Sequence, residues 1–242
     1  MHSILLTNDD GILSDGLIRL AIAAKQFGEV WVAAPDGQRS AASHAITLHG
    51  TIDVYPHSFP VPGVKAFSVS GTPADCVRVG CLSIMPHLPD TVISGINCGF
   101  NVATDLQYSG TVGAAFEAAF QGVRGIALSE AAEEDHAVTD KYLPEILAEL
   151  LEAVPRDGEI FNVNFPGCAL SAFRGILRDR AISRSMIYRD RYRVTETLPN
   201  GGKRLIVDGQ YNEECEPDTD FAAVFSGHIS VSRIRNIGYC NT

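Results

Sequence analysis

The sequence predicts an α/β protein with a doubly wound, mostly parallel β-sheet. Over the first two thirds of the chain, short β-branched apolar runs alternate with segments of helical periodicity. Most of the apolar runs are bordered by Gly, Pro, Ser or Asn, the residues that end strands. Hydrophobic residues make up 45% and charged residues 20% of the 242 positions, so the chain has enough apolar material for a packed core.

The expected elements alternate in order along the chain. The first strand is expected at 3–7, and a helix at 15–27, where apolar residues recur at helical spacing up to Gly28. Further strands are expected at 30–34, 46–54, 66–69, 91–94, 126–129 and 160–163. Further helices are expected at 73–83, 113–121 and 139–153.

The composition changes from about Phe173 onward. Seven arginines follow within a short stretch: Arg174, Arg178, Arg180, Arg184, Arg189, Arg191 and Arg193. A Leu-Pro-Asn-Gly-Gly turn at 198–202 then separates two strand-like runs, which predicts a hairpin arm. A short helix over 218–225 and a strand over 229–234 complete the expected elements. We therefore expect an α/β domain over 1–172, followed by a hairpin arm and C-terminal extension over 173–242.

The charge of the chain restricts its partners. A formal net charge of −10 argues against a general nucleic-acid binder, because neutralising a phosphate backbone requires a dominant basic face. Acidity does not exclude phosphate substrates, since a bound divalent cation inverts the local potential. The arginine-rich stretch could form a nucleotide- or RNA-binding module, but few stacking aromatics accompany it, which favours an intersubunit hairpin.

Sequence features also indicate the cellular compartment and exclude some enzyme classes. The chain has no apolar run long enough to span a bilayer and no secretory segment at its start. Its six cysteines, including Cys240, form no C-x-x-C pair. We therefore expect a cytoplasmic protein with reduced thiols. The P-loop and the dinucleotide fingerprint G-x-G-x-x-G are both absent.

Two adjacent carboxylates, Asp9 and Asp10, follow the first predicted strand. In an open parallel sheet, ligands bind beyond the carboxyl ends of the strands, and Gly11 gives the backbone freedom for a tight turn there. Adjacent carboxylates repel each other unless a cation holds them, and hard oxygen ligands suit Mg²⁺, Mn²⁺ or Ca²⁺. A helix-capping pair of aspartates in a turn is the structural alternative.

Three further polar loops follow predicted strands. The loop 35–44 carries hydroxyls and His44, although an ordinary polar loop would look the same. In the loop 94–101, Asn97 offers a neutral oxygen ligand. Residues 108–111 place hydroxyls and backbone N–H groups at a helix start, where an anion is favoured, although capping alone would explain Ser109 or Thr111. By contrast, 70–75 is explained by a helix start with Thr72 as N-cap.

Together these segments resemble the SurE family of stationary-phase survival proteins. The segments that carry the resemblance, in the family's order, are ILLTNDDGI, APDGQRSAASHAITL, VSGTPADCV, ISGINCGFN, YSGTVGAAFEA and DTDFAAVFSGHISVS. The chain departs from the family at its end, SVSRIRNIGYCNT, where a TPL-like sequence is usual. The resemblance implies a Rossmann-like domain, a protruding β-hairpin arm and a C-terminal segment used to assemble a homodimer or homotetramer.

The resemblance also implies an activity and a site. It implies a 5′-nucleotidase that hydrolyses nucleoside 5′-monophosphates; a broader phosphatase acting on sugar phosphates or polyphosphate stays open. One divalent cation, Mg²⁺ or Mn²⁺ with Ca²⁺ as another occupant, would be bound by Asp9, Asp10, Ser40 and Asn97.

We further expect distinct roles for the residues around this cation. A metal-activated water is the expected nucleophile, because the first strand lacks the D-x-D pattern of aspartyl-phosphate enzymes. One of the two aspartates would act on that water. The phosphate is expected on Asn101, Ser109, Gly110 and Thr111. His44 would either assist the leaving group or hydrogen-bond within its loop.

Overall fold

The structure is a computed structural model that describes residues 2–132, 135–212 and 214–239. It confirms the α/β class with a large, mostly parallel sheet. Over the described residues this sheet has nine strands in the order β3-β4-β2-β1-β5-β6-β7-β13-β8. Their bounds are β1 (His2–Thr7), β2 (Gly28–Pro35), β3 (Val54–His57), β4 (Lys65–Val69), β5 (Thr91–Cys98), β6 (Arg124–Glu130), β7 (Glu159–Phe165), β8 (Ile176–Arg178) and β13 (Ile229–Arg235).

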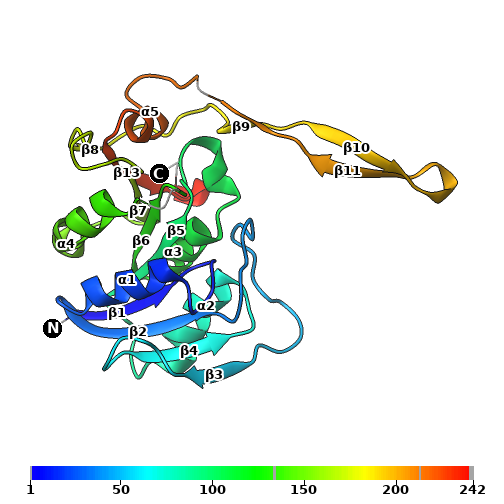
Figure 1. The fold of residues 1–242 in the computed structure, drawn as a ribbon. Helices are drawn as coiled ribbons and strands as arrows, with labels where there is room; N and C mark the ends of the chain where they lie inside the picture. The colour runs from blue at the N-terminus through cyan, green and yellow to red at the C-terminus, as the bar shows by residue number, and fades with distance from the viewer. Residues whose placement is uncertain (1, 133–134, 213, 240–242) are drawn as a thin grey trace.

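Helices cover both faces of this sheet (Figure 1). They are α1 (Asp15–Ala24), α2 (Pro73–Val79), α3 (Gly110–Phe120), α4 (Ala137–Glu152) and α5 (Asp220–Phe225). Shorter helical turns are η1 (Gly80–Ile84), η2 (Ala103–Gln107), η3 (Pro199–Gly201) and η4 (Ile237–Tyr239). Helices α1 and α4 share one apolar core with the sheet, and α2 and α3 share the other.

The strand order creates a crevice beside β1. Strands β2 and β5 both pair in parallel with β1, on opposite sides, so the chain direction across the sheet reverses there. Along β1 the side chains alternate: Ile4 and Leu6 pack into the α1 and α4 core, while Leu5 packs into the α2 and α3 core. A strand buried on both faces reads as a continuous apolar run, as this one does. Ligands of open α/β sheets bind at such a reversal, just beyond the carboxyl ends of the strands.

The strand predicted at 46–54 is wrong. Most of this segment is a loop, and β3 begins only at Val54 and pairs antiparallel with β4. Side chains satisfy the loop backbone in place of a neighbouring strand: the Thr47 N–H donates to Asp75 Oδ1 at 2.9 Å, and the Asp53 N–H donates to Ser70 Oγ at 2.9 Å. Apolar alternation alone does not reveal such partners.

Local capping explains where helices α3 and α2 begin. The structure starts α3 at Gly110, three residues before the predicted start, because Ser109 caps the helix and accepts from the Val112 N–H at 3.1 Å. The predicted cap at Thr72 is confirmed as a capping box with Asp75. Burial opposes ionisation of Asp75, but hydrogen bonds from Thr47 and Thr72 hold its pKa below the ordinary value.

The predicted hairpin arm is present and projects away from the body of the protein (Figure 1). It is formed by β10 (Tyr192–Thr197) and β11 (Lys203–Val207), with the short pair β9 (Tyr188–Arg189) and β12 (Gln210–Tyr211) at its base. The region after residue 172 is more than an arm, however, because β8 and β13 belong to the main sheet. The division of the chain at 172 and 173 stays a prediction.

Several arginines of the basic stretch are paired with carboxylates. On β8, Arg178 donates to Glu149 of α4 at 2.8 Å. Arg189 pairs with Glu214 at 2.8 Å and Arg193 with Asp208 at 3.5 Å. Each of these arginines is therefore accompanied by a carboxylate, which reduces the local positive charge.

The described helices and thiols add two observations. None of the described helices is both long and apolar enough to cross a membrane. The described cysteines form no disulfide, and Cys240 lies outside the described residues. Burial raises the pKa of Cys81 to about 12 and also raises that of Cys76, so both thiols are protonated at neutral pH.

Candidate active site

A pocket of about 230 Å³ opens beyond the carboxyl ends of β1 and β5, at the reversal of the sheet. Its lining residues are Asp9, Ser40, Ala41, Asn97, Cys98, Phe100, Asn101, Asp105, Tyr108 and Ser109. Five of the eight residues predicted for the site therefore meet in one pocket, although they come from separate segments of the chain. They meet because the carboxyl ends of parallel strands lie at the same edge of the sheet.

The other three predicted residues surround this pocket. Asp10 lines an adjoining hollow, and its Oδ2 accepts from the backbone N–H of Cys98 at 3.2 Å. Thr111 is completely buried, and its hydroxyl donates to Asp9 Oδ1 at 2.6 Å. Gly110 lies so close to Asp9 that an added Cβ would be 3.1 Å from Asp9 Oδ2. The first turn of α3 is thus packed directly against the carboxylate of Asp9.

The loop after β1 is organised by the buried side chain of Asn8. Its Oδ1 accepts from the Gly11 N–H at 3.2 Å, while its Nδ2 donates to the Gly11 carbonyl at 3.0 Å and to Ser14 Oγ at 2.7 Å. Gly11 has a φ of 101°, a conformation that favours glycine. The N–H of Arg39 donates to the Asp9 carbonyl at 2.7 Å, which fastens the loop of Ser40 to the same turn.

Asp9 and Asp10 form a cluster of negative charge. Asp9 is 4% exposed, and burial raises its pKa from 3.8 to about 6, with a contribution from the charge of Asp10 and an opposing one from the Thr111 hydrogen bond. Burial also raises the pKa of Asp10. Within the described part of the chain no Lys, Arg or His pairs with either carboxylate, and the nearby Arg39 pairs with Asp36 at 2.7 Å. Both carboxylates therefore lack a protein counter-charge.

Asn97 reaches the pocket through an irregularity of β5. The β5–β6 register shifts between Ser94 and Asn97, and Gly95 there has a φ of 142°. An added Cβ on Gly95 would be 2.3 Å from the Leu128 carbonyl oxygen, so only glycine fits this close approach of the two strands. The Asn97 Nδ2 donates to the Gly99 carbonyl at 2.8 Å, which leaves its Oδ1 for another partner.

The predicted ligand set fits a hard divalent cation. It consists of two carboxylates, the Ser40 hydroxyl and the Asn97 amide oxygen, all neutral or anionic oxygen donors of the kind that Mg²⁺, Mn²⁺ and Ca²⁺ prefer. The described residues contain no group of three or more His, Cys, Asp or Glu arranged to hold a metal, so the proposed set depends on Ser40 and Asn97 besides the two carboxylates. The uncompensated charge of Asp9 beside Asp10 is the observation that favours a cation here.

Two asparagines of β7 hold Asn101 in place and were not predicted. The Asn101 N–H donates to Asn164 Oδ1 at 2.8 Å, and its carbonyl accepts from the Nδ2 atoms of Asn162 at 2.9 Å and Asn164 at 3.0 Å. The Asn101 Nδ2 donates to Ser129 Oγ at 2.8 Å. The available signal was the Phe-Asn-Val-Asn-Phe pattern, because residues at i and i+2 of a strand share one face.

A buried carboxylate from the late family segment also supports the pocket. Asp220 is completely buried, and its Oδ2 accepts from the Ala103 N–H at 2.9 Å. Its Oδ1 accepts from the N–H groups of Ser183 at 2.9 Å and Phe221 at 2.8 Å. Ala103 has a φ of 56°, which is strained for a residue with a Cβ. Asp220 therefore fixes the loop between Asn101 and η2.

His44 does not line this pocket. Its Nε2 lies 2.9 Å from Glu117 Oε2, and its ring stacks on Phe120 with centroids 5.2 Å apart. Glu117 also accepts from Arg78 at 3.2 Å and Gln121 at 2.8 Å. Of the two predicted roles of His44, this geometry supports hydrogen bonding that anchors its loop to α3.

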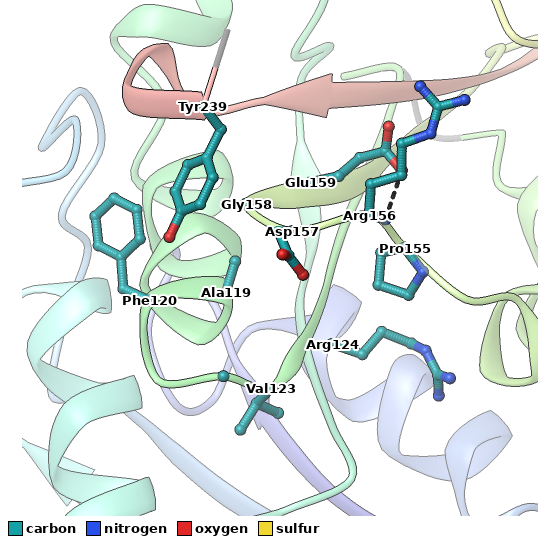
Figure 2. Close-up of a pocket in the computed structure, with 11 residues that line it drawn as sticks. Ala119, Phe120, Val123, Arg124, Pro155, Arg156, Asp157, Gly158, Glu159 and Tyr239 are labelled. Carbon is teal, nitrogen blue, oxygen red and sulfur yellow. Dashed lines mark hydrogen bonds between the residues drawn. The ribbon is translucent and has the colours of Figure 1, made fainter. Parts of the chain in front are cut away.

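A larger pocket lies at the opposite end of the sheet (Figure 2). It measures about 410 Å³ and is formed near the starts of β6 and β7. Figure 2 shows Tyr239 and Phe120 on one side of it and Pro155 and Arg124 on the other, with Asp157 between them. It contains none of the residues predicted for the site. Pocket size alone therefore does not point to the predicted site residues.

Comparisons with known proteins identify the family of the chain. The sequence profile of the family described as Survival protein SurE matches residues 4–187. The chain is 37% identical to the 5′-nucleotidase SurE of Symbiobacterium thermophilum, over 97% of this chain and 92% of that protein. It is also 37% identical to the 5′/3′-nucleotidase SurE of Cronobacter sakazakii, over 95% of this chain and 88% of that protein.

A solved structure extends the similarity to three dimensions. The crystal structure of the SurE protein from Aquifex aeolicus superposes with a TM-score of 0.80 at 32% sequence identity. The match covers 96% of this chain and 92% of that one, so it includes the arm and the C-terminal strand as well as the α/β domain. By profile, sequence and structure, the chain belongs to the SurE family.

Proposed function

We propose that this protein is a divalent-metal-dependent 5′-nucleotidase that hydrolyses nucleoside 5′-monophosphates to nucleosides and phosphate. The observation that carries the proposal is the buried Asp9 beside Asp10, without a protein counter-charge, at the reversal of the sheet. The start of α3 packed against Asp9 adds an anion-binding element next to the cation site. The names of the two relatives, 5′-nucleotidase and 5′/3′-nucleotidase, support the same activity.

The proposed cation ligands are Asp9, Asp10, Ser40 and Asn97. Bound there, Mg²⁺ or Mn²⁺ would polarise a phosphoryl oxygen and lower the pKa of a water molecule. Thr111 supports this arrangement from behind, because its hydroxyl orients the Asp9 carboxylate by a 2.6 Å hydrogen bond. Asp9 or Asp10 orients the attacking water and accepts its proton.

The proposed phosphate ligands lie at the start of α3 and in the loop after β5. Because the first N–H groups of a helix have no carbonyl partner within it, the N–H of Gly110 is available to phosphate oxygens, while that of Thr111 donates to the Asp9 carboxylate. Ser109 contributes to the same corner as the helix cap. Asn101 brings its amide into the pocket and is held on three sides by Asn162, Asn164 and Ser129. Rigid donors of this kind stabilise the charge that develops in the transition state.

The activity is tested by phosphate release from a substrate panel. The panel contains nucleoside 5′- and 3′-monophosphates, sugar phosphates and polyphosphate, each with Mg²⁺ or Mn²⁺ and again with EDTA. We expect the fastest release from 5′-monophosphates, a loss of at least about a hundred-fold in EDTA, and recovery when Mg²⁺ or Mn²⁺ is restored. Equal rates on sugar phosphates would indicate the broader phosphatase. Undiminished release in EDTA would contradict the metal-dependent proposal.

We further propose that the hairpin arm assembles the chain into a homodimer or homotetramer. Every residue of β10 and β11 is exposed in the single chain, including several large apolar ones: Tyr192, Val194, Leu205, Ile206 and Val207. Two-stranded ribbons with exposed apolar side chains are stable when another surface covers them. Sedimentation equilibrium should show a dimer or tetramer that dissociates on Leu205→Asp. A monomeric wild-type protein would contradict this proposal.

A further inference from the structure

We propose that Asp105 and Tyr108 recognise the nucleoside part of the substrate: the Asp105 carboxylate accepts hydrogen bonds from the ribose hydroxyls, and the Tyr108 ring stacks on the base. The inference rests on the proposed 5′-nucleotidase function and identifies which groups of the substrate the same pocket selects. Both residues line the 230 Å³ pocket, and neither belongs to the proposed cation or phosphate ligands.

The pocket is too small to enclose a whole nucleotide. A volume of 230 Å³ is below the range of roughly 300–1,000 Å³ that encloses most small ligands. The phosphate and the sugar fill such a volume, so the base has to extend to the mouth. A residue that contacts the base must therefore be exposed, and Tyr108 is 61% exposed.

The backbone of Tyr108 is held on both sides. Its N–H donates to the Asp105 carbonyl at 3.0 Å, and its own carbonyl accepts from the Ser43 N–H at 2.9 Å. The next residue is Ser109, the cap of α3 at the phosphate end of the pocket. A ring anchored beside the phosphate corner is suited to stacking, which adds affinity for every base because each base has a π-face.

Asp105 presents an acceptor that suits neutral donors. Its carboxylate accepts from the backbone N–H of Ile187, at the base of the arm, and from the Thr104 hydroxyl, and Asp190 is a nearby like charge. Within the described chain no basic side chain pairs with it. Because a carboxylate without a basic partner repels a phosphate group, its place in this pocket fits the sugar. Ribose hydroxyls are neutral donors, and hydrogen bonds to an ionised acceptor are the stronger kind.

Asp105 could also have a purely structural role, because its carboxylate connects η2 to Ile187. One variant, measured on two substrates, distinguishes this role from recognition of the ribose. Asp105→Asn keeps an oxygen that accepts from Ile187 but removes the charge. With a ribonucleoside 5′-monophosphate we expect KM to rise about ten-fold, with kcat within about two-fold. With the matching 2′,3′-dideoxynucleotide we expect no change in either constant. Asp157→Asn, in the pocket of Figure 2, is the matched control and should leave both substrates unaffected.

Tyr108→Ala tests the stacking half of the proposal. We expect KM for nucleoside monophosphates to rise roughly ten-fold, KM for ribose 5-phosphate to stay unchanged, and Tyr108→Phe to behave as wild type. Tyr55→Ala removes a tyrosine of similar exposure, 65%, from the edge strand β3 and serves as the control.

Each outcome of these measurements is decisive. Equal losses on the two substrates of a pair, or no loss on either, would overturn recognition by that residue. A wild-type protein that hydrolyses ribo- and dideoxynucleotides equally well would overturn the role of Asp105 while the nucleotidase function stands. A wild-type protein that releases phosphate from neither would mean that the proposed function itself has failed.

Discussion

Asp9→Asn is expected to reduce phosphate release by at least about a hundred-fold and, in the same protein, to stabilise the metal-free fold. The loss of activity follows from the loss of one of the two charges that hold the cation. The gain in stability follows from burial, because Asp9 is 4% exposed and has no basic partner among the described residues. An amide of the same shape keeps an oxygen for the Thr111 hydroxyl and carries no charge to desolvate.

The stability effect depends on pH with a defined sign. The pKa of Asp9 is about 6 in the fold and 3.8 in the ordinary state, so the folded protein binds the proton more tightly. The stabilisation from this group is complete below about pH 4 and is lost as the pH rises through about 6. At pH 7 the ionised group then costs about 3 kcal/mol, because each pKa unit corresponds to about 1.4 kcal/mol.

Thermal unfolding in EDTA measures this directly. At pH 7 the Asp9→Asn variant should melt about 5 °C or more above wild type, and the difference should shrink as the pH is lowered toward 4. Asp10→Asn is the matched comparison: it should lose activity to a similar degree, with a smaller gain in stability, because Asp10 is only partly buried. A melting difference that does not change with pH, or full activity in both variants, would contradict the assignment of Asp9.

The parts of the site that follow from local sequence were predictable, and the parts that depend on distant partners were not. Asp9, Asn97 and Ser109 each follow a recognisable strand or begin a helix, and strand order alone brings such residues to one edge. The support of Asn101 comes from residues 61 and 63 positions away on β7. The partners of these asparagines depend on the register between β6 and β7. Neither segment alone predicts that register.

The same distinction explains the wrong strand at 46–54 and the role of His44. The loop 46–54 has the alternation of a strand, but its backbone is held by Asp75, which lies in a helix start further along the chain. For His44 the sequence leaves leaving-group assistance and hydrogen bonding equally open, and its contact with Glu117 of α3 favours the second role. In both cases the local pattern was correct, and a tertiary hydrogen bond determined the outcome.

Asp220→Ala is expected to have the largest effect on stability, a loss of about 3–5 kcal/mol. The carboxylate is completely buried and accepts from three backbone N–H groups, those of Ala103, Ser183 and Phe221. Removing it leaves these donors without a partner inside the protein, and each such donor costs about 1–3 kcal/mol. Urea unfolding monitored by circular dichroism measures the change. A loss below about 1 kcal/mol would show that water replaces the carboxylate and that the site is less closed than the contacts indicate.

Asp220→Asn distinguishes two roles of this carboxylate: stabilising the region around Ser183 and holding the pocket loop at Ala103. The amide keeps one oxygen for Ser183 and Phe221 but presents a nitrogen to the Ala103 N–H, so the bond to the pocket loop is the one lost. We expect a smaller loss of stability, about 1–3 kcal/mol, together with a disproportionate fall in kcat, because Ala103 lies between Asn101 and Asp105. Asp208→Asn removes a 60% exposed partner of Arg193 in the arm and should change stability by less than about 1 kcal/mol. If Asp220→Asn lowers stability but leaves kcat unchanged, the strained loop at Ala103 holds its shape without this bond, and Asn162, Asn164 and Ser129 are sufficient to position Asn101.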